Sequence, residues 1–150
     1  MLSQEELSDF QKQIRQDFYR YRNGIVADAL KSLYPSGKLI FGLTAPQFMD
    51  ISKKYPKDEM LGMALWNDNH SRESRLMALY ILPPEKIDKE KAKTLVEQVE
   101  STEQAEFLAF RILRRLENTK DIFQELSLEE FSNSMSTYCM QMYQKNITSL

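Results

Sequence analysis

The chain has 150 residues, of which 42% are hydrophobic and 28% are charged, and this balance is typical of a globular protein rather than a disordered one. Only four glycines and five prolines are present, which disfavours a turn-rich β sandwich, and the single cysteine, Cys139, excludes an internal disulfide. The formal net charge of −2 argues against tight, non-specific binding of nucleic acid. We therefore expect residues 1–150 to form a single all-α domain.

The first predicted helix spans residues 4–20. Its apolar residues recur at intervals of three or four positions, which places them on one face of a helix. They are Leu7, Phe10, Ile14 and Phe18.

A second helix is predicted to begin after Asn23, whose short polar side chain suits the N-cap, and to end before Pro35. Its spacing places several apolar residues on the face that we expect to be buried. They are Ile25, Val26, Ala29, Leu30 and Leu33.

The middle of the chain predicts three further helices. Thr44 followed by Gln47 is typical of a capping box and predicts a helix to about Tyr55. A second should open at Pro56 and end after Trp66, which we interpret as a core residue rather than a stacking one. A third is expected over residues 71–82, where two prolines follow.

The last third of the chain predicts four more helices. Asp88 should cap a lysine-rich helix to about residue 99, and Ser101 with Gln104 a helix to about residue 117. A short helix is expected over residues 119–126. Ser127 with Glu130 is predicted to cap the final helix, which should either close the core or expose an apolar face for contacts with a partner. That face comprises Met135, Tyr138, Cys139, Met142 and Tyr143.

An internal repeat relates two of these helices. Residues 70–82 align with residues 101–113 at an offset of 31, and the aligned pairs include identical residues. These pairs are Ala78 with Ala109, Ile81 with Ile112, and Leu82 with Leu113. A helical unit that recurs at about this length is typical of an α-solenoid. The sequence thus predicts a right-handed α-α superhelix, a HEAT-like repeat solenoid of about seven to nine helices.

Basic residues gather at two places along this predicted solenoid. Because equivalent helices of a solenoid lie side by side, these residues could line up as one strip that contacts phosphates. The alternative is that they occupy solvated faces, with Arg72 and Glu73 forming an ordinary ion pair. The strip would comprise Lys53, Lys54, Lys57, Arg72, Arg75, Arg111, Arg114 and Arg115.

Short motifs follow one another in a fixed order between Phe41 and Leu82. They are Phe41-Gly42-Leu43 with Pro46, then Ala64-Leu65-Trp66, then Arg72-Glu73 followed by Ala78 and Ile81-Leu82. Their order and spacing resemble the AlkD-type DNA alkylation repair proteins, which are built from HEAT-like repeats. With the preceding segment 26–35, the resemblance covers about the first three quarters of the chain.

This resemblance implies a curved solenoid whose concave face holds duplex DNA. The enzymes of the family cleave the N-glycosidic bond of cationic alkylpurines such as 7-methylguanine, and they do so without drawing the base into a pocket. Their motif of a Trp followed one turn later by an Asp aligns with Thr102 and Glu106 here. The resemblance therefore implies Glu106 as the carboxylate that stabilises the developing oxocarbenium charge. The alternative is a solvated first-turn residue favoured by the helix dipole.

Taken together, these patterns favour an AlkD-like repeat protein that binds duplex DNA without catalysis. One alternative is a protein–protein interaction module, and another is an alkylpurine DNA glycosylase that uses Glu106. Because His70 is the only histidine, no metal site is expected, and no motif indicates a cofactor. No segment is apolar enough to enter a membrane, so a cytoplasmic protein is predicted, and its oligomeric state is left open.

Overall fold

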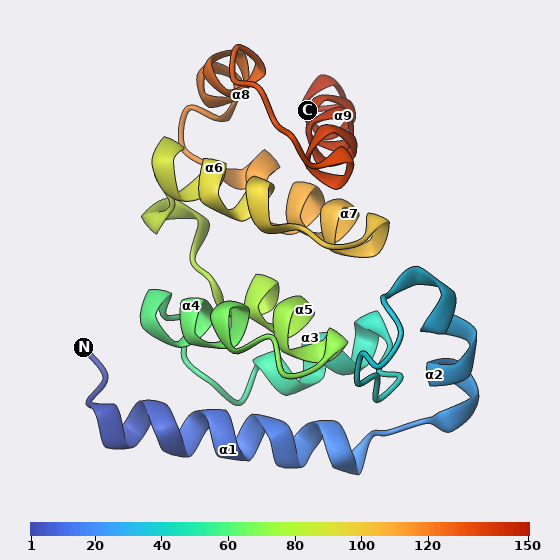
Figure 1. Ribbon diagram of the computed structural model, residues 1–150. Coiled ribbons are helices and arrows are strands. Elements are labelled where there is room, and N and C mark those ends of the chain that lie inside the picture. Colours follow the sequence, from blue (N-terminus) through green and yellow to red (C-terminus); the bar gives the residue numbers. More distant parts are fainter. The chain divides into compact units, whose positions relative to one another are not determined.

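The computed structural model describes residues 1–150 and confirms the all-α prediction, since it holds nine α-helices, three short 3-10 helices and no strand (Figure 1). Its contacts divide the chain into two compact units, Met1–Leu82 and Pro83–Leu150, which we describe separately. The superhelix, its handedness and the single domain over residues 1–150 stay predictions.

The first unit contains five α-helices. These are α1 (Gln4–Arg20), α2 (Gly24–Leu30), α3 (Ala45–Ser52), α4 (Glu59–Asp68) and α5 (Arg72–Ile81). A short turn joins α4 to α5, and in this turn Asn69 adopts a left-handed conformation with φ +45°. These two helices pack closely, with α1 against α4 and α3 against α5. Trp66 lies at the centre of this packing with none of its surface exposed, which confirms that it is a core residue.

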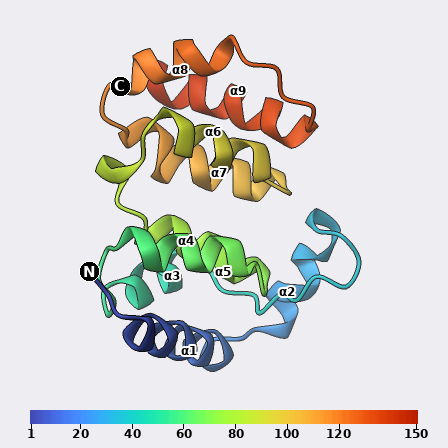
Figure 2. The same cartoon turned by 60° about the vertical axis from the view of Figure 1, so that its left-hand side comes forward.

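The second unit contains four α-helices, and Figure 2 shows α8 and α9 lying together beside α6 and α7. Their bounds are α6 (Lys89–Gln98), α7 (Thr102–Arg111), α8 (Thr119–Ser127) and α9 (Ser134–Thr148). The closest packing is between α7 and α9. The last helix therefore closes the core of this unit, and its buried row is Ser136, Cys139, Tyr143 and Ile147.

Several predicted helix starts are confirmed by their hydrogen bonds. The side chain of Asn23 accepts the N–H of Val26, and that of Asp88 accepts the N–H of Lys91. The Gln47 side chain accepts the N–H of Thr44 at 2.9 Å. These caps are local interactions, which is why sequence spacing alone finds them.

The predicted buried face of α2 is wrong. Ile25 is 85% exposed and Leu33 is also exposed, whereas the buried residue of α2 is Ala27. One cause is the close approach of α2 to the backbone of the loop that contains Gly42. A Cβ atom on Gly42 would lie 2.3 Å from the carbonyl oxygen of Asn23 and 2.9 Å from the nitrogen of Ala27. Only a small residue fits at such a close approach of two backbones.

The predicted start of the last helix is also wrong. Ser127 ends α8, where its hydroxyl donates to the carbonyl of Gln124, and α9 begins only after Asn133. The Asn133 side chain accepts the N–H of Met135 and donates to the carbonyl of Val99 at 2.9 Å. This cap is therefore also tied to the segment that follows α6, 34 positions earlier, which sequence spacing does not reveal.

Three other helix boundaries differ from the prediction. Asp58 rather than Pro56 precedes α4, because its carboxylate accepts the N–H of Leu61. The helix before it, α3, ends at Ser52. The helix after Ser101 ends at Arg111 and continues as a 3-10 turn, Leu113–Arg115.

The residues of the internal repeat occupy equivalent environments. All six residues of the identical pairs are at most 2% exposed. The N-caps Ser71 and Ser101, however, are 30 positions apart, one fewer than the offset of the side-chain match. Helices α5 and α7 thus share the same pattern of buried residues, but their N-caps are offset by one residue relative to that pattern.

A buried carboxylate holds the first unit together. Glu73 has no exposed surface, and its two carboxylate oxygens accept the backbone N–H groups of Phe41, Gly42 and Leu43 at 2.9–3.2 Å. The Arg72 guanidinium donates to the same carboxylate at 2.6 Å and to the carbonyl of Leu43 at 2.9 Å. The loop therefore binds to the start of α5 through its backbone, and the charge of Glu73 is compensated inside the protein.

Replacement of this carboxylate should destabilise the protein strongly. Glu73→Gln removes the negative charge and leaves the buried Arg72 guanidinium without its counter-ion, so we expect the free energy of unfolding to fall by about 3–5 kcal/mol. Urea denaturation followed by circular dichroism measures this loss. The matched control is Glu5→Gln at an exposed position, with an expected change within about 0.5 kcal/mol. Similar losses in the two variants would contradict the anchoring role.

Alkaline pH should destabilise the second unit through Tyr143. Burial raises the pKa of this phenol to about 12, while a tyrosine of the unfolded chain titrates near 10. The contribution of the protonated Tyr143 to the free energy of unfolding is therefore complete below pH 10. As the pH rises from 10 to 12, this contribution falls by about 1.4 kcal/mol per pH unit. Buried Cys139, with its pKa raised to about 12, adds a loss of the same sign.

Urea titrations at pH 9–12 test this expectation. Tyr143→Phe should make stability fall less steeply with pH, whereas Tyr21→Phe, at an exposed position, should leave the slope unchanged. An unaltered slope in Tyr143→Phe would rule out this phenol as the titrating group.

Candidate nucleic-acid interface

Three of the predicted phosphate-contacting residues lie on one loop of the first unit. Lys53, Lys54 and Lys57 are all exposed in the segment between α3 and α4. The Lys53 ammonium lies 3.8 Å from the Asp50 carboxylate, a loose pair of two exposed side chains. These three lysines thus share one short segment, which we call the lysine loop.

The lysine loop is anchored to α1 by a buried aspartate. Asp17 accepts a hydrogen bond from the Lys54 ammonium at 2.8 Å and another from the Tyr55 hydroxyl at 2.6 Å. Burial, and then the bond to Asp17, raise the pKa of Tyr55, so this phenol remains a donor. Lys54 is therefore partly neutralised, while the charges of Lys53 and Lys57 face solvent.

The other two predicted residues of the first unit point inward. Arg72 is bound to Glu73 and to the Leu43 carbonyl, as described above. Arg75 donates from Nε to the Trp66 carbonyl at 3.1 Å, and its guanidinium lies 4.5 Å from the centre of the Trp66 ring. Both side chains are buried, so their charges stabilise the protein interior rather than an exposed phosphate-binding surface.

The three arginines of the second unit lie at the end of α7 and in the 3-10 turn after it. Arg115 is exposed and Arg111 is half-buried. Arg114 donates from Nε to the Phe110 carbonyl at 2.6 Å, and its guanidinium stacks 3.8 Å from the Phe110 ring centre. This stacking orients the guanidinium of Arg114 as a flat, preorganised donor.

Glu106 lies exposed on α7 and has one protein partner. The Tyr138 hydroxyl of α9 donates to its Oε1 at 2.5 Å, while its Oε2 accepts no hydrogen bond from the protein. The bond to Glu106 is the main cause that raises the pKa of Tyr138, so the phenol keeps its proton through the neutral range. The result is an exposed carboxylate held in place by one oxygen.

Glu106 belongs to a row of side chains on α7 and the turn that follows. Positions 102, 106, 110 and 114 recur every four residues, so they follow one face of the helix at intervals of roughly 6 Å. Thr102 is half-buried, and Phe110 is 47% exposed although it is a large apolar residue. A carboxylate, an aromatic ring and a guanidinium therefore lie in order along one exposed row, which we call the α7 row.

Comparison with known proteins identifies the family. The model of the DNA alkylation repair enzyme family matches residues 14–146, almost the whole chain. The chain belongs to this family. No curated protein and no solved structure matches it. The match extends past the first three quarters of the chain and includes both Glu106 and Tyr138.

Within this DNA alkylation repair protein, sequence reasoning missed Tyr138. It was predicted only as part of the apolar face of the last helix, because nothing near it in the sequence suggests a polar role. The available signal was its distance of 32 positions from Glu106, close to the repeat offset of 31. A solenoid brings residues so spaced onto neighbouring helices.

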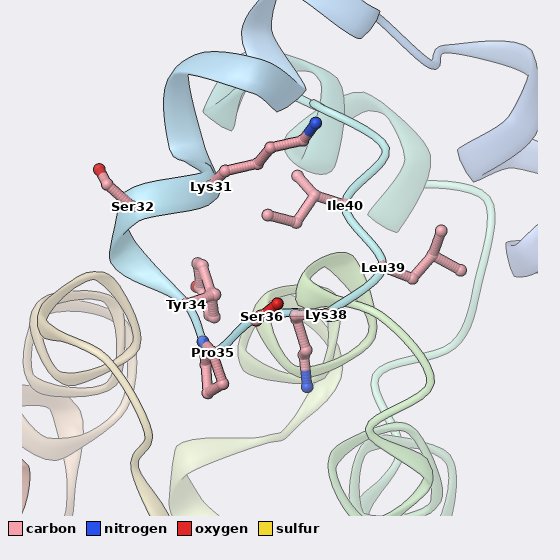
Figure 3. A pocket seen from close by; sticks show the side chains of 9 residues that line it. Lys31, Ser32, Tyr34, Pro35, Ser36, Lys38, Leu39 and Ile40 are labelled. Carbon is pink, nitrogen blue, oxygen red and sulfur yellow. The ribbon is translucent and has the colours of Figure 1, made fainter.

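One hollow of the first unit is lined by none of the predicted site residues. It has a volume of about 770 Å³ and is bordered by residues 31–40, among them Lys31, Tyr34 and Ile40 (Figure 3). The Lys31 ammonium is paired with Asp28 at 2.8 Å, and the Lys38 ammonium donates to the Asn69 side chain at 2.6 Å. Its nearby charges are thus bound by the protein, which gives no indication of a ligand.

No three side chains of His, Cys, Asp or Glu converge as metal ligands, and His70 lies exposed in the turn between α4 and α5. None of the helices combines the length and apolarity that crossing a bilayer requires.

Proposed function

We propose that this DNA alkylation repair protein binds duplex DNA that carries a cationic alkylpurine, with the α7 row facing the damaged nucleotide. Family membership supports a role in the repair of alkylated DNA. The observation that carries the proposal is the exposed carboxylate of Glu106, held by Tyr138 in the same row as Phe110 and Arg114.

A carboxylate on a DNA-binding surface has an electrostatic cost, because it repels the phosphates. It becomes favourable where the ligand carries a positive charge, and alkylation at N7 gives a purine such a charge. A carboxylate and an exposed aromatic ring both attract cations. The α7 row therefore suits an alkylated purine better than an undamaged one.

The exposed basic residues would supply the contacts to phosphate. In this proposal Arg114 and Arg115 bind the backbone near the lesion. Arg72 and Arg75 take no part, since their guanidinium groups are buried. With a net charge of −2, the protein should bind DNA modestly and with a steep dependence on salt.

Binding without catalysis is the form of the proposal that we favour. The family's Trp is replaced by Thr102, which has no aromatic face to pack against DNA. Glu106 is one methylene longer than the family's Asp, which moves its charge. These changes weaken the preorganised charge that glycosidic cleavage requires.

Glycosylase activity is the second candidate, and the free Oε2 of Glu106 favours it. In that reaction the C1′–N9 bond of 7-methyl-2′-deoxyguanosine breaks, and the base leaves as a neutral molecule with both bonding electrons. The sugar becomes an oxocarbenium ion, which Glu106 would stabilise electrostatically. Water then adds at C1′ and loses a proton to solvent, which leaves an abasic site.

Phosphate contacts should be visible in the salt dependence of binding. We expect a labelled duplex to bind at low salt and to weaken steeply at moderate salt. Arg114→Ala and Arg115→Ala should each weaken binding of every duplex and reduce the slope of log K against log salt by about one. The control is Lys12→Ala, which removes an exposed charge from α1. Absence of binding even at low salt would overturn the proposal and favour an interaction module, for which Ile25 and Leu33 offer exposed apolar surface.

Glu106 should determine the preference for damaged DNA. We expect wild-type protein to bind a duplex with one 7-methylguanine more tightly than the same duplex with guanine, and Glu106→Gln to lower this preference by about tenfold. Glu130→Gln, at another exposed glutamate, should leave it unchanged. The same samples distinguish the two candidates, because a glycosylase releases free 7-methylguanine and the Glu106→Gln variant does not. An equal affinity of wild-type protein for both duplexes would contradict a role of Glu106 in lesion recognition.

A further inference from the structure

The hydroxyl of Tyr138 lies at the edge of the contact between α9 and α7. Its neighbours Ser136 and Cys139 belong to the buried row of α9, and Tyr138 itself is only half-buried. From this position it donates to Glu106, 32 residues earlier in the chain. The bond therefore joins the last helix to the exposed side of α7.

Hydrogen bonds on both sides of Tyr138 fix its position. Ser136 donates to the carbonyl of Val96 at 2.7 Å, and the Cys139 thiol donates to the carbonyl of Ala105 at 3.7 Å. Ala105 directly precedes Glu106, so the contact that places Cys139 also sets the register between Tyr138 and Glu106. The phenol is thus held against the carboxylate by packing that does not involve the carboxylate itself.

An exposed glutamate without such a partner would not have a fixed carboxylate. Its three side-chain torsions are free in solvent, and fixing them costs conformational entropy. A hydrogen bond to an ionised acceptor is strong enough to offset much of this cost. Because the bond engages Oε1, it leaves Oε2 for another partner.

We propose that Tyr138 is a positioning residue, whose hydrogen bond orients the Glu106 carboxylate toward a cationic nucleotide bound at the α7 row. This role rests on the proposed function, since Glu106 must face the damaged base. Tyr138 need not touch the DNA, because it acts through Glu106.

The test compares Tyr138→Phe, Glu106→Gln and the double variant by their preference for a 7-methylguanine duplex over the guanine duplex. Tyr138→Phe keeps the ring and removes only the hydroxyl. We expect it to lower the preference by about three- to tenfold while affinity for the guanine duplex stays unchanged. In the Glu106→Gln background it should have no further effect, because the carboxylate that it positions is absent. Tyr19→Phe, which alters an exposed tyrosine of α1, is the matched control.

A second measurement reports the hydrogen bond without DNA. Carbon-13 NMR of ring-labelled tyrosines, assigned with Tyr138→Phe, gives the pKa of Tyr138. It should lie above 10 in the wild-type protein and fall toward 10 in Glu106→Gln. An unperturbed pKa of Tyr138 in the wild-type protein would show that this hydrogen bond is absent in solution, which would overturn the positioning role.

The outcomes separate the two proposals. Wild-type protein that binds neither duplex overturns the proposed function, and with it the role of Tyr138. Wild-type protein that prefers the damaged duplex, together with an unchanged preference in Tyr138→Phe, overturns the positioning role alone. A purely structural role would lower the melting temperature of Tyr138→Phe without changing its preference or its coupling to Glu106.

Discussion

The first unit depends on one buried carboxylate. Glu73 accepts three consecutive backbone N–H groups from the loop that contains Gly42, and this brings the loop backbone against α2. Gly42 has φ +92° and no room for a Cβ atom, so the loop can follow this path only with glycine. The motifs around Gly42 and Arg72-Glu73 are thus two halves of one interaction. Their part in the family resemblance reflects how the unit folds.

The same interaction explains why charge in the sequence is a poor guide to charge on the surface. Arg72 was predicted to contact phosphate, yet its guanidinium compensates Glu73, and Arg75 is held over the Trp66 ring. Lys53 and Lys57 carry the same charge and are exposed. What separates the two pairs is a set of tertiary partners, Leu43 among them, that lie far away along the chain. Spacing within a helix cannot identify such partners.

Local interactions were predictable, whereas long-range contacts were not. The helices and most of their caps follow from spacing and from side chains within four residues, which is why Asn23 and Asp88 were placed correctly. The buried face of α2 depends on the close approach of the Gly42 backbone, and the start of α9 depends on the hydrogen bond from Asn133 to Val99. Both are contacts between distant parts of the chain, so the predictions from sequence spacing were wrong there. In the candidate site, Glu106 follows from the family resemblance. Tyr138 could be identified only from the structure, because its contact with Glu106 arises from the packing of α9 on α7.

The acidity of the second unit fits a protein that selects by lesion charge. Residues 83–150 hold nine Lys and Arg against twelve Asp and Glu, a net charge of −3. A net negative charge repels phosphates, and a fixed carboxylate at the contact adds to this repulsion. Specificity is a difference between two affinities, so a lower affinity for undamaged DNA raises selectivity as effectively as a tighter contact to the lesion. In the proposed complex the positive charge of an alkylpurine removes the penalty that Glu106 imposes on every other base. The acidic composition, which argues against a general DNA-binding protein, is thus compatible with the lesion-selective binding that we propose.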